Sequence, residues 1–433
     1  MQNNPAAYTS DVYKPNKVAI IGGGIASLIL ADYLSKKSPN LEITLLCKDS
    51  DIASQGSSNK QGAIYPLLQA GKSIISTFYA QAFEHAIKYY RDTLPSASVV
   101  PHQWCGVLQQ AFNPTMPEKF KEISQLWAHI TEYIDDKSSS ELAGISTPYS
   151  SLYFKDGGWI NPNQFCKWLL NDLISNRKVS ILQNTEVNSI SKSHLGDSWE
   201  VFSGGVKTVA DHVVICAGID SPLVTYASIN SIPIDGVLGQ VSSFNTESST
   251  QPLKTVLCHK GYITPSDGKY QAFGATFEKN YESITSTQEA MSQNIAQIKK
   301  VFPFEDWAQQ VSNELVNHNN AAVRATTPDH IPIAGELFDW SWIKHHVDNN
   351  NGKYKRADKI QGKLDNPLQG LYCLTGLGAR GLTSAPILAD MVSDLIVNSG
   401  RVSKPLNNLI ETTAPMRFQL REYKRTKVLP KVN

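Results

Sequence analysis

Residues 17–34 read KVAIIGGGIASLILADYL, an apolar run, three glycines and a second apolar run. This order predicts a buried strand, a tight turn and a helix, the arrangement that binds a dinucleotide. Gly22 lets the chain turn as it leaves the strand, and Gly24 lets the backbone approach a pyrophosphate. Ser27 replaces the third glycine of G-x-G-x-x-G with another small residue. The helix N-terminus would face the anion; the alternative is an ordinary strand-to-helix turn.

Composition excludes several classes of protein. The chain has 433 residues, 41% of them hydrophobic and 18% charged, and a net charge of +1. This length suits two domains and excludes neither enzymes nor binding proteins. No apolar run reaches the roughly 18 residues that span a membrane, and residues 1–16 lack signal-peptide features, so we expect a loose tail and a cytoplasmic location. The charge excludes a uniformly basic nucleic-acid-binding protein but not a local basic patch.

The six cysteines are scattered, and none forms a C-x-x-C pair. Several lie inside apolar runs, which predicts buried thiols in a reducing compartment. No His, Asp or Glu spacing indicates a metal site.

A second predicted strand, residues 43–46, would complete the first βαβ unit. In dinucleotide folds an acid at the end of this strand holds the adenosine ribose. Here Asp49 comes slightly later, so the ribose contact is displaced or made by backbone, and this position does not decide between NAD and FAD.

A third predicted strand, residues 212–218, ends in Ala217-Gly218, where bare backbone can pass close to a cofactor. Residues 371–375 then predict another strand, followed by a glycine loop at 376–381 and a helix over 386–397. Two such loops predict a cofactor held from both ends. The intervening chain predicts helices at 73–94, 163–173 and 287–301, a polar connector at 135–140, and short strands of an inserted sheet at 239–244, 256–264 and 270–277.

These motifs together resemble the D-amino-acid-oxidase-like flavoprotein family. A narrower resemblance is to the FAD-dependent oxidoreductase half of the bifunctional MnmC enzymes, which modify the tRNA wobble uridine. It is carried by SSNKQGAIYPLL at 57–68, GATF at 274–277, DHIP at 329–332 and GLGARGL at 376–382.

The resemblance implies an α/β fold: a Rossmann-like FAD-binding domain with an inserted antiparallel-sheet substrate domain. We assign residues 17–75, 150–225 and 320–433 to the first and 76–149 and 226–319 to the second.

The resemblance also implies a reaction. FAD would oxidise 5-carboxymethylaminomethyl-(2-thio)uridine, and water would release glyoxylate and 5-aminomethyl-(2-thio)uridine. The motif begins at Val18, so we expect only this oxidative step, with methylation absent or done by a separate SAM-dependent methyltransferase.

The expected FAD contacts lie in five segments: the first glycine turn, the end of the second strand, the segment after it and the two later strand ends. They are Gly22, Gly24, Ile25, Ala26, Ser27, Asp49, Ser57, Ser58, Asn59, Gln61, Ala217, Gly218, Gly376, Gly378, Ala379, Arg380, Gly381 and Leu382. The alternative for 57–61 is a polar turn before a buried strand.

Three residues are expected to carry the chemistry. Arg324 occupies a segment that resembles the one holding the carboxylate-binding arginine of glycine and sarcosine oxidases, and a guanidinium grips a carboxylate bidentately; the alternative is a structural pair with Asp329. Tyr262 would donate to the carboxylate, or is simply a half-buried strand residue. Arg380 would favour negative charge on the reduced flavin, or makes a surface or phosphate contact.

The run 417–427 has five basic residues against one acid, with Phe418 and Tyr423 between them. We expect this tail to contact the tRNA anticodon loop through phosphates and stacked bases. A second basic stretch, 353–363, reads as an exposed loop.

Two rival functions remain. The first is a small-molecule amine or D-amino-acid oxidase, which would turn over free glycine or sarcosine. The second is a non-catalytic FAD-bound tRNA-binding module, whose flavin modified tRNA would not bleach.

Overall fold

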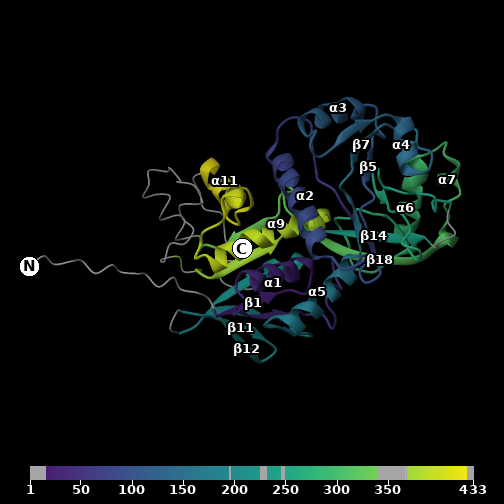
Figure 1. Ribbon diagram of the computed structural model, residues 1–433. Coiled ribbons are helices and arrows are strands. Elements are labelled where there is room, and N and C mark those ends of the chain that lie inside the picture. The colour runs from purple at the N-terminus through teal and green to yellow at the C-terminus, as the bar shows by residue number, and fades with distance from the viewer. Residues whose placement is uncertain are drawn as a thin grey trace, which may run out of the picture.

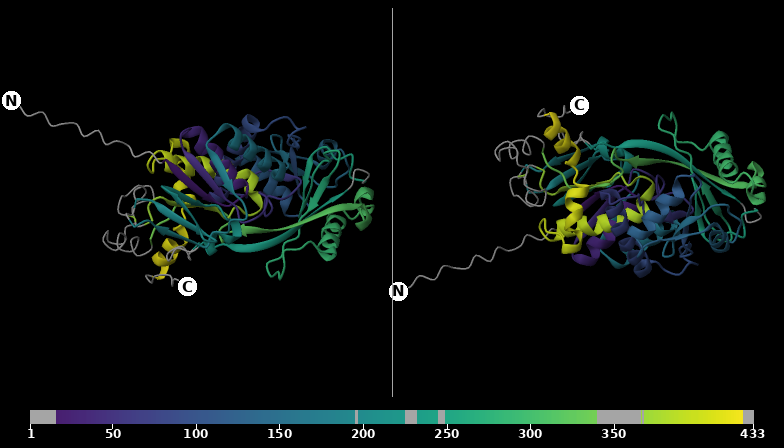
Figure 2. Two further views of the ribbon diagram at one scale, coloured as in Figure 1. Left: turned by 90° about the horizontal axis from the view of Figure 1, so that it is seen from below. Right: turned by 90° about the horizontal axis from the view of Figure 1, so that it is seen from above.

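The computed structural model describes residues 16–194, 197–224, 232–244, 249–339, 366 and 368–426. Two halves, each built on a sheet, lie side by side (Figure 1), and two long strands run across the molecule when it is seen from below (Figure 2). The basic stretch 353–363 lies outside the described residues.

The first half contains a six-stranded sheet of the order β19-β20-β13-β1-β2-β9. Its strands are parallel except for the edge strand β19, which confirms the Rossmann-like prediction. The strands are β1 (Lys17–Ile21), β2 (Glu42–Leu46), β9 (Val179–Leu182), β13 (His212–Ile215), β19 (Ile333–Glu336) and β20 (Leu371–Thr375).

Both faces of this sheet are buried, which is why β1 is apolar almost throughout. Val18 and Ile20 face a layer of helices: α1 (Ile25–Lys37), α2 (Ile74–Thr93), α5 (Pro162–Asn176) and α9 (Gly381–Val397). Ala19 and Ile21 face a small antiparallel sheet of β10 (Ser189–Lys192), β11 (Trp199–Ser203) and β12 (Val206–Ala210). α2 packs on α9, so this helix lies on the cofactor half although the predicted division placed residues 76–149 in the substrate domain.

The second half contains an eight-stranded sheet of the order β18-β14-β17-β16-β15-β5-β7-β6. Neighbouring strands are antiparallel except for β15 and β5. Helix α6 (Gln288–Val301) covers one face, and the other face packs toward the first half. The strands are β5 (Val107–Gln110), β6 (Glu132–Ile134), β7 (Ser151–Phe154), β14 (Asp235–Phe244), β15 (Val256–Cys258), β16 (Tyr262–Ile263), β17 (Gln271–Gly274) and β18 (Val316–Thr326).

Three local predictions differ from the structure. The expected strand 256–264 is a hairpin of β15 and β16, with a turn at 259–261. The expected connector 135–140 begins helix α4 (Asp136–Ala143), because the Asp135 carboxylate accepts from Ser138 N at 2.8 Å and caps the helix. The expected domain boundary at 319/320 falls inside β18, which pairs with β14 along its length.

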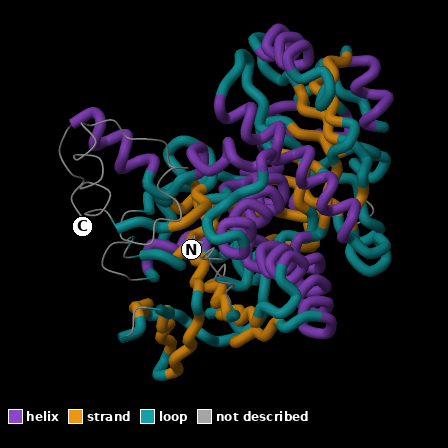
Figure 3. The backbone as a smooth tube through the Cα atoms, turned by 60° about the vertical axis from the view of Figure 1, so that its left-hand side comes forward, coloured by secondary structure: helices purple, strands orange, loops and turns teal. Residues whose placement is uncertain are grey.

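Shorter elements complete the fold (Figure 3). They are β3 (Gly62–Ile64), β4 (His102–Gln103), β8 (Gly158–Ile160), α3 (Met116–Leu126), α7 (Asp306–Gln309), α10 (Asn407–Thr413), α11 (Arg417–Thr426), and the 3₁₀ turns η1 (Gly218–Leu223), η2 (Asn313–Leu315), η4 (Gly378–Arg380) and η5 (Lys404–Leu406). All six cysteines are free thiols. Within the described ranges, no helix has the length and apolarity to cross a bilayer.

Helix α11 is docked on the protein by charge and packing. Arg417 is 5% exposed and donates to both carboxylate oxygens of Asp329, at 3.0 and 2.8 Å. Arg421 donates to the same carboxylate at 2.8 Å, and Phe418 packs under both guanidinium groups and against the core. The prediction that this tail offers its side chains to tRNA is therefore wrong for Arg417 and Phe418, because both are engaged within the fold.

Replacing Arg417 with Ala should lower the free energy of unfolding by about 3 kcal/mol at neutral pH, because the Asp329 carboxylate then loses its buried guanidinium partner and keeps the exposed Arg421. Burial raises the pKa of Asp329, but Arg417 and Arg421 outweigh it and hold the pKa below its usual value. The pair's contribution is thus present above the unfolded pKa of about 3.9 and is lost as pH falls through the folded value. Denaturant unfolding at several pH values measures this.

The control is Arg425→Ala, an exposed position on the same helix, which should change stability by less than about 0.5 kcal/mol. Equal destabilisation by the two variants would show that the pair with Asp329 does not hold α11.

Candidate active site

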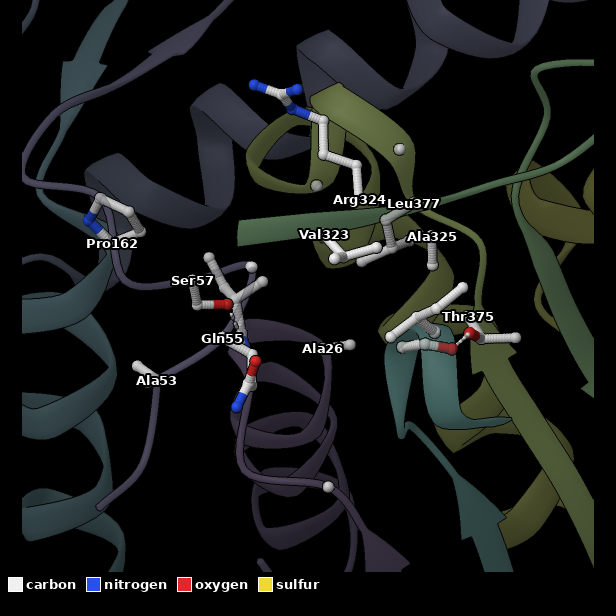
Figure 4. A pocket seen from close by; sticks show the side chains of 18 of the residues that line it. Ala26, Ala53, Gln55, Ser57, Pro162, Val323, Arg324, Ala325, Thr375 and Leu377 are labelled. Atoms are coloured by element: carbon white, nitrogen blue, oxygen red, sulfur yellow. Dashed lines mark hydrogen bonds between the residues drawn. The ribbon is translucent and has the colours of Figure 1, made fainter. Parts of the chain in front are cut away.

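A cavity of about 480 Å³ lies where the carboxyl ends of β1, β13 and β20 meet the eight-stranded sheet (Figure 4). This size is within the ordinary range for small-molecule sites. Seventeen of the expected site residues line it, and Ser27, Ser58 and Gln61 do not. The close-up shows Ala26 and Gln55 on one side and Arg324 projecting from β18 on the other.

The first glycine turn has the geometry of an anion site. Gly22 has φ +134°, and a Cβ there would overlap the Cys216 carbonyl oxygen. Gly24 is the N-cap of α1, which has no side-chain cap and no acid in its first turn. The Ser57 hydroxyl enters the turn and accepts from Ile25 N at 3.1 Å. The N-terminal N–H groups and the positive end of the helix dipole therefore point at the cavity.

The second glycine loop faces the first across the cavity. Gly376 and Gly378 have positive φ values of +70° and +58°, and the loop opens α9, whose first turn also lacks an acid and a side-chain cap. The Thr375 hydroxyl donates to Gly218 O at 3.0 Å, which ties this loop to the end of β13. The two predicted loops thus converge on one cavity.

The end of β2 supplies polar groups around Asp49, which lines the cavity and accepts from Gln55 Nε2 at 3.1 Å. Lys48 forms an ion pair with Asp220 at 2.6 Å, closing the chain around this end. The sequence analysis missed Lys48 and Gln55 because they lie in an irregular segment with no motif.

The three expected contacts that do not line the cavity are Ser27, Ser58 and Gln61. Ser27 is buried where α1 meets the strands. Ser58 exchanges hydrogen bonds with Asn320 of β18, at 2.9 and 3.2 Å. The Gln61 amide donates to Pro265 O at 2.9 Å and accepts from Thr264 Oγ1 and Ala272 N at 2.7 and 2.8 Å.

Arg324 is a cation on the side of the cavity formed by the eight-stranded sheet. It lies on β18, and its guanidinium donates only to Thr276 O, at 3.3 Å, with no acidic partner within 4.0 Å in the part of the chain that the structure describes. Asp329, the expected alternative partner, is instead held by Arg417 and Arg421. Burial lowers the pKa of Arg324, yet a guanidinium stays charged, so this cation faces the cavity without a counter-ion.

Gly239 of β14 makes room for this guanidinium. A Cβ at Gly239 would overlap the terminal nitrogens and carbon of Arg324. Sequence analysis missed Gly239 because a glycine inside a strand carries no signal for what crosses it.

Tyr262 lies beside Arg324 and lines the same cavity. Its hydroxyl donates to Gln61 O at 3.2 Å, and burial raises its pKa, with Arg324 acting in the opposite direction. The phenol is therefore neutral and a donor at physiological pH.

Arg380 lies over the ring of Tyr65, with 4.3 Å from its guanidinium carbon to the ring centre. Burial opposes its charge, but Tyr65 and Tyr79 outweigh this and raise its pKa. Burial likewise raises the pKa of Tyr65 to about 12. Arg380 is thus a permanent cation at the start of α9.

Residues 17–395 match the family described as DAO, FAD dependent oxidoreductase. The chain belongs to this family. DAO-family proteins include the curated relatives named tRNA 5-methylaminomethyl-2-thiouridine biosynthesis bifunctional protein MnmC. That of Pseudoalteromonas translucida is 33% identical over 99% of this chain and 62% of its own length, and that of Pseudoalteromonas atlantica is 32% identical over 98% and 61%. The chain thus spans about three fifths of the length of these relatives.

A solved structure supports the DAO fold. Glycine oxidase from Geobacillus kaustophilus superimposes with a TM-score of 0.71 over 93% of this chain and 98% of its own, at 15% identity. This similarity concerns the fold alone.

The cofactor of this FAD-dependent oxidoreductase is FAD, and the residues present fit it. The N-termini of α1 and α9, neither of which has a side-chain hydrogen bond from its N-cap residue, face one cavity. In the turn before α1, the backbone at Gly22 has a conformation and a space that only glycine fits. These are the features that bind a diphosphate. The described residues contain no group of three or more His, Cys, Asp or Glu side chains arranged to hold a metal ion.

Replacing Gly22 with Ala should strip FAD from the purified protein, because the new Cβ meets the Cys216 carbonyl and φ is positive. The measurement is the flavin absorbance per protein. Gly268→Ala is the matched control, since Gly268 has φ +90° but open space around its Cβ position. If Gly22→Ala kept as much flavin per protein as the control, the first glycine turn would not be part of the FAD site.

Proposed function

We propose that this chain is the oxidase that removes the carboxymethyl group from 5-carboxymethylaminomethyl-(2-thio)uridine at the tRNA wobble position, which also places it in the cytoplasm. The observation that carries the proposal is the charged Arg324 guanidinium, facing the FAD cavity without an acidic partner among the described residues. Such a cation is suited to a substrate that brings its own carboxylate. We propose tRNA as the substrate because the names of the relatives refer to tRNA modification.

When bound, FAD supplies the acceptor for the hydride that leaves the substrate's glycine-like carbon. The protein's part is to place that carbon. Arg324 binds the carboxylate through two parallel N–H groups. The Tyr262 hydroxyl, which donates to Gln61 O in the structure, adds a neutral donor for the same carboxylate. Because both residues belong to the same sheet, their donors keep a fixed spacing.

Arg380 contributes from the opposite side. It lines the cavity at the N-terminus of α9, so its charge and the helix dipole add at one place. We infer that the Arg380 charge and the helix dipole would together stabilise the negative charge that a bound FAD gains on reduction.

The described residues supply one active site, for oxidation. Methylation of the exposed amine needs a second site, which we assign to a SAM-dependent methyltransferase acting on the product.

The decisive experiment incubates the FAD-loaded protein with tRNA that carries 5-carboxymethylaminomethyl-2-thiouridine. We expect the flavin to bleach without oxygen, and mass analysis of the wobble nucleoside to show loss of the carboxymethyl group. Bleaching by free glycine or sarcosine, but not by the tRNA, would instead establish a small-molecule oxidase. If neither the tRNA nor the free amino acids bleach the flavin, the chain would be a non-catalytic binding module.

Arg324→Lys should raise the Michaelis constant for modified tRNA by about tenfold or more and keep FAD bound. Lysine keeps the charge but loses the bidentate grip, and one charge-assisted hydrogen bond is worth roughly 1.5–3 kcal/mol. Steady-state kinetics with flavin absorbance as the loading check measures this.

Gly239→Ala should act in the same direction, because its Cβ displaces the guanidinium without changing its chemistry. Gly268→Ala again serves as control. Unchanged Michaelis constants in both active-site variants would remove Arg324 from substrate binding.

A further inference from the structure

The cavity has an aromatic residue at its edge that the mechanism above does not use. Phe277 lines the cavity, follows strand β17 and is 66% exposed. Single exposed apolar side chains are common on protein surfaces, so the significance of Phe277 lies in its position: its ring lies on the wall of the cavity. The ring lies 5.8 Å from the guanidinium carbon of Arg324.

The backbone around Phe277 is fixed on both sides. Thr276 accepts from Arg324 through its carbonyl at 3.3 Å and from Gln240 N through its hydroxyl at 2.9 Å. Glu278 exchanges two backbone hydrogen bonds with Leu238, each of 2.9 Å. The ring is therefore presented from a strand-like segment that is tied to β14, and its position is coupled to that of Arg324.

We propose that Phe277 is the platform on which the wobble uracil stacks while Arg324 holds its side arm. This inference rests on the proposed function and names the residue that recognises the base. Four bonds separate the uracil ring from the carboxylate carbon of the arm, a span of about 5 Å when extended. A ring beside the guanidinium is thus within reach of the base whose carboxylate that guanidinium binds.

Stacking suits this position for a physical reason. An unpaired base in a loop offers an exposed π-face, and aromatic side chains bind such faces without needing a hydrogen-bond pattern. Lys260, at the tip of the β15–β16 turn, is exposed and lines the same cavity. It therefore supplies a cation for the RNA phosphates next to the stacked base. A small amine substrate would need neither group.

The test measures binding of two anticodon stem-loop RNAs to the FAD-loaded protein, one with unmodified uridine at the wobble position and one with an abasic nucleotide there. Neither RNA reacts, so affinity alone is read. Phe277→Ala should weaken binding of the uridine RNA by about fivefold or more and leave binding of the abasic RNA unchanged. Phe277→Trp should restore the affinity for the uridine RNA to within about twofold of wild type.

The control is Phe304→Ala, because Phe304 is 94% exposed and does not line the cavity. It should leave both affinities unchanged. Equal affinity of wild type and Phe277→Ala for the uridine RNA, or equal losses on both RNAs, would overturn the stacking role and leave the proposed function standing. Failure of the wild-type protein to bind either RNA would overturn the proposed function itself.

Discussion

The site depends on one side chain that joins its two halves. Gln61 follows the first βαβ unit along the chain. Its side-chain amide donates to Pro265 O and accepts from Thr264 Oγ1 and Ala272 N, all in the half that contains the eight-stranded sheet. Its own carbonyl accepts from Tyr262. Each of these groups is buried, so an unmade bond would cost roughly 1–3 kcal/mol. The sheet that carries Arg324 is thereby held in register with the glycine turn that carries the cofactor.

Arg324 shows how the second half prepares its charge. Burying a cation without a counter-ion is unfavourable, and in the described part of the chain the Thr276 carbonyl and the face of Phe277 reduce that cost. Gly239 gives the guanidinium a trough across β14. A carboxylate that enters this trough gains the attraction without the cost of first separating an internal ion pair. The trough is therefore suited to the carboxylate that the proposed substrate would bring.

Sequence alone predicted the parts of the site that consist of backbone. The run 17–34 and the loop 376–381 carry glycine spacing, apolar strands and helix starts, and these patterns report local conformation directly. Side-chain roles that depend on the partner sheet were not accessible in this way. Gln61 and Ser58 read as cofactor contacts because their segment does, but their polar ends turn toward β18 and the hairpin. Arg417 read as a surface charge because its partner, Asp329, is remote in sequence.

The buried thiols have a chemical consequence for a redox protein. Burial raises the pKa of all six cysteines, including Cys47 and Cys216, which line the cavity. Oxidants and alkylating reagents attack the thiolate, and these sulfurs stay protonated. We therefore expect these thiols to react with peroxide or iodoacetamide more slowly than exposed cysteines do, so that sulfur oxidation competes little with the chemistry of the cavity.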